Sequence, residues 1–275
     1  MPHQTPAARL SPGQVALQQR LSDFMGLSLL GLAILPWLFA HAPDVCMRKS
    51  LSHFYYDPLV GTLFIGLLFF SGGAMIAMPG ETRLERWIPR IGGSSALSLA
   101  IWPISEPGCD STQPFTARPF ATVDTLTVPD PTNGSLFQVM PYPGGDYFEV
   151  LSFAAGLHVL FAGMVLLSLA LYCLFVLTRV VPERHIKNGA LCASKRNRNR
   201  LYRWCGGIIL GCVAVLAVVL VLGPKEWLPV WDSYHLTYYV EALAIATFAV
   251  AWFAKARRMP SMREAAPIRF KDLNA

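Results

Sequence analysis

Charged residues are scarce in this chain: they make up 15% of its 275 residues, against about a quarter in average globular domains. Because 53% of the residues are hydrophobic, a disordered chain is excluded, and six cysteines are too few for a small disulfide-stapled domain. The sequence also lacks a Walker motif, a G-x-S-x-G motif, a dinucleotide fingerprint and an H-E-x-x-H motif. The common enzyme classes marked by these motifs therefore have no support in the sequence.

The apolar residues gather in runs of the length that crosses a membrane, about 20 helical residues for a hydrocarbon core of about 30 Å. Four runs meet this length, a fifth carries the acid Glu241, and a sixth is weaker because it contains Arg90 and several Gly and Ser residues. The sequence predicts an all-α, polytopic bundle of six transmembrane helices. The predicted spans are Leu21–Ala40, Leu59–Met78, Ile88–Ile104, Val150–Leu177, Gly206–Leu222 and Leu236–Ala254.

The distribution of Lys and Arg favours six spans over five and predicts their orientation. With six spans and both termini cytoplasmic, all but four of the 23 basic residues lie inside, as the positive-inside rule expects. The four exceptions are Arg48, Lys49, Arg118 and Lys225. This predicts a cytoplasmic arm (residues 1–20), a membrane domain (21–256) with a basic cytoplasmic loop (179–203), and a cytoplasmic tail (257–275). No cleavage site closes the first run, so it is expected to remain as the first span.

The net charge of +6 is therefore interpreted as contact with anionic lipid headgroups at the cytoplasmic face, not as affinity for nucleic acid. The densest basic run, residues 195–200, is favoured as a positive-inside anchor. Contact of this run with RNA or with a phosphoinositide-type lipid is the alternative. Membrane lipids are the expected partners, and a homo-oligomer remains open.

On the opposite side, residues 105–147 form a long outer loop that is rich in Pro, Gly, Thr and Asp. Partial alternation predicts a short hairpin between Ala121–Val128 and Ser135–Met140. Cys46 and Cys109 are the cysteines that fall in outer loops, where an oxidising environment favours a disulfide. A bond between them and two separate free thiols both remain open.

Ionisable residues inside a bilayer are costly, so those within the spans are candidate functional residues. Glu241 and His158 lie inside predicted spans, both in the outer half of the membrane. At a similar depth the topology places His53, Asp57, Glu149, Asp232 and His235. Three hypotheses follow: Glu241 and His158 pair with each other or with hydroxyls and specify packing; the set lines a path for a proton or solute; or His53, Asp57, His158 and His235 bind a metal that activates water.

Small and aromatic residues give two further predictions. Two small-residue runs, Ser71–Gly73 and Gly92–Ser95, flank a short basic turn, which predicts a tightly packed hairpin of the second and third spans. A broken-helix ion site is the alternative. Gly207 and Gly211 also permit close approach of a helix. Aromatic residues at span ends are interpreted as an interfacial belt. They are Phe54, Tyr55, Tyr56, Trp227, Trp231, Tyr238 and Tyr239.

The run Arg196–Gly206 and the last span, with Glu241, Phe248, Trp252 and Lys255, resemble a group of uncharacterised bacterial integral membrane proteins. These share an R-N-x-x-Y-x-x-C-G motif and a terminal E-x-x-A-x-x-x-F-x-x-x-W-x-x-K helix, and the segment Ser50–Tyr56 and His158 also look similar. The layout loosely resembles six-span Frag/DRAM/Sfk-type proteins. The resemblance implies a bacterial inner membrane and carries no activity. The polar residues of the spans, Glu241 and His158 first, favour a non-enzymatic binding, sensing or permeation module with an outward-facing polar site, and no cofactor is expected.

The alternative is a metal-dependent membrane hydrolase that acts on lipid, similar to the alkaline ceramidases. That family places three His, an Asp and a Ser around zinc in seven spans, with an H-x-x-x-H pair on the last span. This chain is predicted to have six spans, and four residues after His235 it has Tyr239. Zinc is expected only under this alternative.

Overall fold

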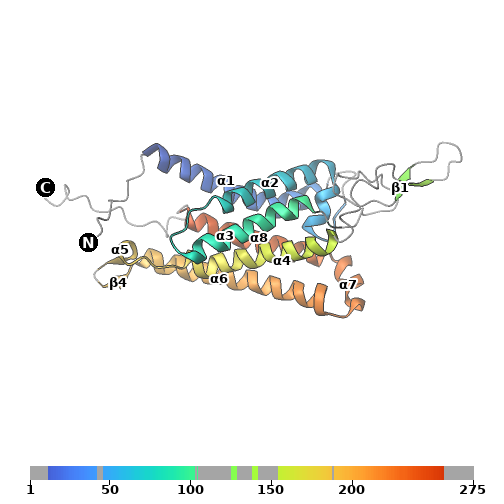
Figure 1. The fold of residues 1–275 in the computed structure, drawn as a ribbon. Coiled ribbons are helices and arrows are strands. Elements are labelled where there is room, and N and C mark those ends of the chain that lie inside the picture. The colour runs from blue at the N-terminus through green and yellow to red at the C-terminus, as the bar shows by residue number, and fades with distance from the viewer. Residues whose placement is uncertain are drawn as a thin grey trace.

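The computed structural model describes residues 12–41, 46–102, 104, 125–128, 138–141, 154–187 and 189–256. Six long helices pack lengthwise in this part of the chain (Figure 1). The strands that it contains form two short hairpins, so the fold is all-α, as predicted. The long helices are α1 (Pro12–Phe39), α2 (Pro58–Ile76), α3 (Arg83–Ile101), α4 (Ala154–Leu171), α6 (Ala193–Leu216) and α8 (Leu236–Lys255).

Five of these helices, with their extensions, are long and apolar enough to cross a membrane. They coincide with five of the six predicted apolar runs, and α3 is the exception because its first turns carry arginines. The candidate spans are Gln19–Phe39, Leu59–Ile76, Gly156–Leu177, Ala193–Leu222 and Leu236–Lys255. The chain therefore has the helices of a multi-pass membrane protein.

Short elements connect and extend the long helices. The 3₁₀ helix η1 (Leu51–Tyr56) precedes α2, and α4 and α6 continue as the π-helical segments η3 (Tyr172–Leu177) and η4 (Ala217–Leu222). Between α6 and α8 lie η5 (Lys225–Trp227) and α7 (Leu228–Ser233), and α5 (Pro182–His185) precedes a hairpin of β3 (Ile186–Lys187) and β4 (Ala190–Leu191).

The predicted outer hairpin is confirmed within the described residues. Strand β1 (Thr125–Val128) pairs antiparallel with β2 (Gln138–Pro141), with Thr125 opposite Pro141. The other residues of the two predicted strands, and most of the loop 105–147, lie outside the described residues.

Helix α3 packs against α2 through glycines, as the sequence predicted. A Cβ added to Gly93 would lie 2.5 Å from the carbonyl oxygen of Gly72, and one added to Gly72 would lie 2.8 Å from that of Gly93. Such distances allow no side chain, so the two backbones touch. A Cβ added to Gly207 or Gly211 would meet nothing within 4 Å, so no helix of the described residues makes the close approach that these glycines permit.

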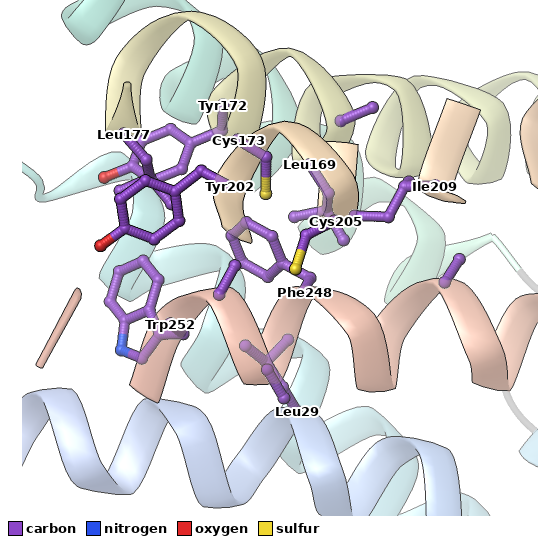
Figure 2. Packing of buried hydrophobic residues seen from close by; sticks show 14 of the residues in the cluster. Leu29, Leu169, Tyr172, Cys173, Leu177, Tyr202, Cys205, Ile209, Phe248 and Trp252 are labelled. Carbon is purple, nitrogen blue, oxygen red and sulfur yellow. The ribbon is translucent and has the colours of Figure 1, made fainter. Parts of the chain in front are cut away.

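The centre of the bundle is filled by aromatic and aliphatic side chains from four of the long helices. Figure 2 shows Leu29 of α1, Leu169 of α4, Ile209 of α6 and Phe248 of α8 in one cluster, with aromatic rings of η3, α6 and α8 at one side. Trp252 of α8 donates from Nε1 to the carbonyl oxygen of Ser22 at 2.9 Å. The end of α8 thus lies beside the beginning of α1.

The bundle has two ends with different short elements. We call the end with η1 and α7 the η1 end, and the end with α5 and the β3–β4 hairpin the α5 end; Figure 1 shows α7 and α5 at opposite ends. The segment before η1 is held against the beginning of α8, because the backbone N–H of Tyr238, in the first turn of α8, donates to the carbonyl oxygen of Lys49 at 3.0 Å.

At the α5 end, the predicted basic loop 179–203 is largely regular structure. Helix α6 begins at Ala193, so the basic run 195–200 is helical. Lys195 and Arg198 are buried, and the ammonium of Lys195 donates to the carbonyl oxygen of Leu177 at 2.9 Å. The amide nitrogen of Asn199 donates to the carbonyl oxygen of Thr178 at 2.9 Å. Part of the basic run therefore caps the end of η3, where carbonyl groups lack helical partners.

Candidate functional site

A cavity of about 410 Å³ lies at the η1 end, between α4, the end of α6 with η4, and the beginning of α8. One wall is apolar and comes from α4, α6 and η4: Val159, Ala162, Leu166, Val213, Leu216, Ala217, Leu220 and Val221. The polar part of the lining, called here the polar wall, comes from η1, the residues before it, and the two helices α4 and α8: Lys49, Ser50, Ser52, His53, His158, Thr237 and Glu241. The site is thus amphipathic.

Glu241 lies on the polar wall and holds η1 against α8. Its Oε2 accepts a hydrogen bond of 2.9 Å from the backbone N–H of Leu51, the first residue of η1. An N–H at the start of a helix has no partner within the helix, and a carboxylate is favoured there. The second carboxylate oxygen is left to accept from another donor.

His158 lies in the first turns of α4 and is buried, with an exposed fraction of 3%. Its Nδ1 is 2.7 Å from the carbonyl oxygen of Trp102, just beyond the end of α3. A carbonyl only accepts, so Nδ1 must carry the proton, and Nε2 of the neutral ring is an acceptor. Nε2 is buried and has no hydrogen-bond partner among the described residues, although His158 lines the cavity.

His53 joins the same wall through a contact within η1. Its Nδ1 is 2.6 Å from the hydroxyl oxygen of Ser50, and both residues are buried. A hydroxyl bonded to an imidazole is the arrangement of a nucleophile and its base. The backbone N–H of Leu51, the residue after Ser50, is however occupied by Glu241 and is not available to an oxyanion. The contact closes the first turn of η1, and binding is the better-supported use of this wall.

The rim of the cavity carries an ion pair that the sequence did not single out. Lys49 and Asp232 approach to 3.3 Å, with their side chains 44% and 28% exposed. Thr237, on the wall, accepts a hydrogen bond of 2.7 Å from Nε1 of Trp231 in α7. The sequence predicted Asp232 at the depth of the other polar residues. It did not single out Lys49, which lies outside the predicted spans, or Thr237, an uncharged residue inside the last span.

Besides Asp232, the structure brings three of the other six predicted residues into the cavity lining: Glu241, His158 and His53. Asp57 lies apart from the cavity lining, where its Oδ1 accepts from the N–H of Val60 at 2.9 Å and caps α2. His235 adopts a left-handed backbone (φ 52°) before α8 and does not line the cavity. The sixth residue, Glu149, lies outside the described residues.

The predicted packing pair and the predicted metal set are both corrected. Glu241 and His158 bond to backbone groups of other segments, not to each other or to hydroxyls. Among the described residues, no three His, Cys, Asp or Glu side chains gather closely enough to hold a metal ion. The physical reason is the break at Asp57: the residue before a proline is extended, so His53 and Asp57 do not share a helical face.

A buried cation lies near the capping carboxylate of Asp57. Burial lowers the pKa of the Arg48 guanidinium below its ordinary value, while the charge of Asp57 partly restores it. Cys46, two residues earlier, is disulfide-bonded, and Cys173, Cys192, Cys205 and Cys212 are free. Cys109, the predicted partner, lies outside the described residues. The segment before η1 is thus held by a covalent bond.

Comparison with protein-family models, with curated proteins and with solved structures finds no match to this chain. The interpretation of the site therefore depends on its chemistry alone.

Proposed function

We propose that this protein is a six-span membrane protein that binds an amphiphilic ligand in the cavity at the η1 end, through ligand groups that donate hydrogen bonds. The ligand has an apolar body and a polar head that carries an ammonium or hydroxyl group. The proposed role is non-enzymatic: the protein binds or senses this ligand at the outer face of the membrane.

Six spans are supported by the place of α3. It packs between α2 and α4, and its buried residues include Gly92, Gly93 and Ser95. A sixth crossing also agrees with the contact between Trp252 and Ser22, which brings the two ends of the helical chain together. The α5 end carries the basic residues of α6, and the positive-inside rule assigns this end to the cytoplasm. By the resemblance described above, the membrane is a bacterial inner membrane.

The observation that carries the proposal is Nε2 of His158, a buried atom without a hydrogen-bond partner among the described residues, in a cavity that Glu241 also lines. A buried polar atom without a partner costs about 1–3 kcal/mol. Both groups are acceptors, so a ligand must supply donors. An ammonium head satisfies the carboxylate of Glu241 by charge and His158 by hydrogen bonding, whereas a carboxylate or sulfate head would meet an acceptor at both of these residues.

The apolar wall defines the rest of the ligand. The lining residues from His158 to Leu166 span two turns of α4, and those from Val213 to Val221 span two turns of α6 and η4. Val221 is 66% exposed, so the wall continues to the outer surface of the bundle. An alkyl chain in this position is buried without the loss of any hydrogen bond.

The test uses the protein in nanodiscs of zwitterionic lipid and a fluorescent dodecylamine as probe. We expect saturable binding that Glu241→Gln weakens by about tenfold or more, the range for a charge-assisted hydrogen bond of about 1.5–3 kcal/mol. Glutamine still accepts from the N–H of Leu51, so the substitution removes the charge and keeps the fold. Unlabelled dodecylamine added from solution, and a lipid with an amine head included in the nanodisc, distinguish a soluble amphiphile from a membrane lipid as the source.

The matched control is Glu226→Gln, which removes an exposed acid of η5 that does not line the cavity. It should leave the affinity unchanged, and dodecanoic acid should not compete with the probe. Equal affinity in wild type and Glu241→Gln would contradict the proposal.

A further inference from the structure

A second hollow lies at the α5 end, away from the cavity. It is an open groove of about 430 Å³, lined by Arg196, Asn199, Arg200, Arg203 and Trp204 of α6 and by Leu191 of β4. The five α6 residues stand at positions i, i+3, i+4, i+7 and i+8, so they lie on one face of the helix. We call this hollow the arginine groove.

The arginine groove has an unbalanced positive charge. Three guanidinium groups line it, and no acidic side chain is among its described lining residues. The neighbouring Lys195 and Arg198 are buried on another face of the same helix, 5% exposed each, while Arg196, Arg200 and Arg203 are exposed. The basic run therefore divides into residues that hold the end of η3 and residues that are left facing the groove.

The floor of the groove adds a buried acceptor. Asn199 is 7% exposed, and its amide nitrogen donates to the carbonyl oxygen of Thr178. Since that carbonyl accepts, the other amide atom must be the oxygen, Oδ1. It is buried and has no hydrogen-bond partner among the described residues. The groove thus offers several cationic donors and one acceptor that requires a donor such as a hydroxyl group.

The apolar surface that follows the groove indicates where its ligand comes from. Trp204 lines the groove and is 65% exposed, and one turn later Ile208 is 43% exposed. Gly211 and Val215 continue the same face, and a Cβ added to Gly211 would meet nothing within 4 Å. An exposed tryptophan between a basic segment and an apolar one is typical of the membrane interface.

We propose that the arginine groove binds the headgroup of an anionic phospholipid that carries a hydroxyl group, as phosphatidylglycerol does. The phosphate lies against Arg196, Arg200 and Arg203, and a headgroup hydroxyl donates to Oδ1 of Asn199. The acyl chains lie along the face of Trp204 and Ile208. This inference rests on the membrane placement proposed above, but not on the ligand of the cavity.

A nucleic acid is the less favoured occupant. A basic groove alone would suit the phosphates of RNA equally well. RNA, however, makes no favourable contact with the apolar face that continues from Trp204, and inside the bilayer RNA would not reach this face. Lipid headgroups between helices at the cytoplasmic side are recognised by basic pockets of this kind.

The experiment measures lipid binding to the detergent-purified protein by native mass spectrometry, with palmitoyl-oleoyl phosphatidylglycerol, phosphatidylcholine and phosphatidylethanol. Arg200→Gln/Arg203→Gln is expected to weaken phosphatidylglycerol binding by about thirtyfold, the factor for two surface charges near an anionic membrane. Phosphatidylethanol has the same single negative charge but no hydroxyl group, and it should bind about fivefold more weakly than phosphatidylglycerol, the worth of one hydrogen bond.

The matched control is Arg83→Gln/Arg86→Gln, which removes two exposed arginines in the first turn of α3. It should change the affinity by less than about twofold. Equal losses in both double variants would overturn the proposal, because they would show diffuse charge attraction. Displacement of the lipid by a 20-nucleotide RNA would also overturn it. The amine probe of the cavity should bind both double variants normally, so the two proposals fail separately.

Discussion

The two ends of the bundle use polar residues in opposite ways. At the η1 end, Glu241 and His158 each bond one backbone group of another segment, have a second acceptor atom, and line the same cavity. At the α5 end, Lys195 and Asn199 cap the carbonyl groups that end η3, and the arginines beside them remain exposed. One end thus offers acceptors inside an apolar cavity, and the other offers cationic donors at the surface.

This contrast shows how one side chain can serve both stability and recognition, because one of its polar atoms bonds the protein and another remains for a ligand. A buried polar group must first satisfy a neighbour, because an orphan costs more in the bilayer than in water. Side chains with two hydrogen-bonding atoms, such as Glu, His and Asn, can bond the protein with one and a ligand with the other. Both proposed sites are built on such side chains.

The largest effect is expected from a substitution that disturbs the close packing of α2 against α3, on which both ends of the bundle depend. Gly93→Val places a side chain where the carbonyl oxygen of Gly72 lies 2.5 Å from the added Cβ, and backbone cannot rotate away. We expect a loss of about 3 kcal/mol, the upper range of overpacking, and a loss of ligand binding at the cavity. Thermal unfolding, followed with a dye that reacts with the buried free thiols of Cys173 and Cys205, measures it.

Gly207→Val is the control for this prediction. Gly207 is exposed, and an added Cβ meets nothing within 4 Å, so its melting temperature should remain that of the wild type. Similar losses in both variants would mean that the contact between α2 and α3 is not close.

A more local pair of substitutions distinguishes the residues that cap η3 at the α5 end from the residues that line the arginine groove. Lys195→Met removes the donor to the carbonyl oxygen of Leu177 and leaves that buried acceptor unpaired. The expected loss is about 2 kcal/mol, as for a hydrogen bond from a charged group. The same unfolding assay should show a change below about 0.5 kcal/mol for the exposed neighbour Arg196→Met. The reverse order would mean that the two sets of basic residues were assigned to the wrong roles.

From the sequence, the apolar helices and two ionisable residues of the cavity could be predicted, but the hydrogen-bond partners of these residues could not. Runs of about 20 apolar residues have one stable solution in a bilayer, so α1, α2, α4, α6 and α8 were predictable. Glu241 and His158 were identifiable because ionisable groups in such runs are rare and costly. Their partners, the N–H of Leu51 and the carbonyl oxygen of Trp102, are backbone groups, and a sequence gives no sign of which backbone groups are free.

Residues at helix ends were the least predictable. Phe54, Tyr55 and Tyr238 fit an interfacial belt by position but are at most 3% exposed, because η1 folds back into the bundle. Tyr239 and Trp227 are exposed, as a belt requires. The start of α6 at Ala193 was missed because buried Lys195 and Arg198 look like loop residues until η3 is placed beside them. Burial of a charge depends on its partner, and the partner comes from another helix.

The smallest effect concerns an ion pair that closes the α5 end. Glu85 completes a capping box with Thr82 at the start of α3, and its Oε1 accepts from Arg179 at 2.6 Å. Burial alone would raise the pKa of Glu85, but the bonds from Arg179 and from the backbone N–H groups of Thr82 and Glu81 outweigh it and lower the pKa below 4.5. The same pair raises the pKa of Arg179.

The sign of the pH dependence follows from this lowered pKa. The stabilisation by Glu85 is fully present above pH 4.5, the ordinary value, and is lost as the pH falls through the lower value of the folded protein. Glu85→Gln should therefore lower the melting temperature at neutral pH by less than Lys195→Met does, since a pair open to solvent stabilises weakly. The difference from wild type should shrink as the pH falls from 4.5 through the lower pKa of the folded protein, whereas Glu226→Gln should show no such convergence. A difference that persists unchanged at low pH would mean that Glu85 acts through its shape in the capping box and not through its charge.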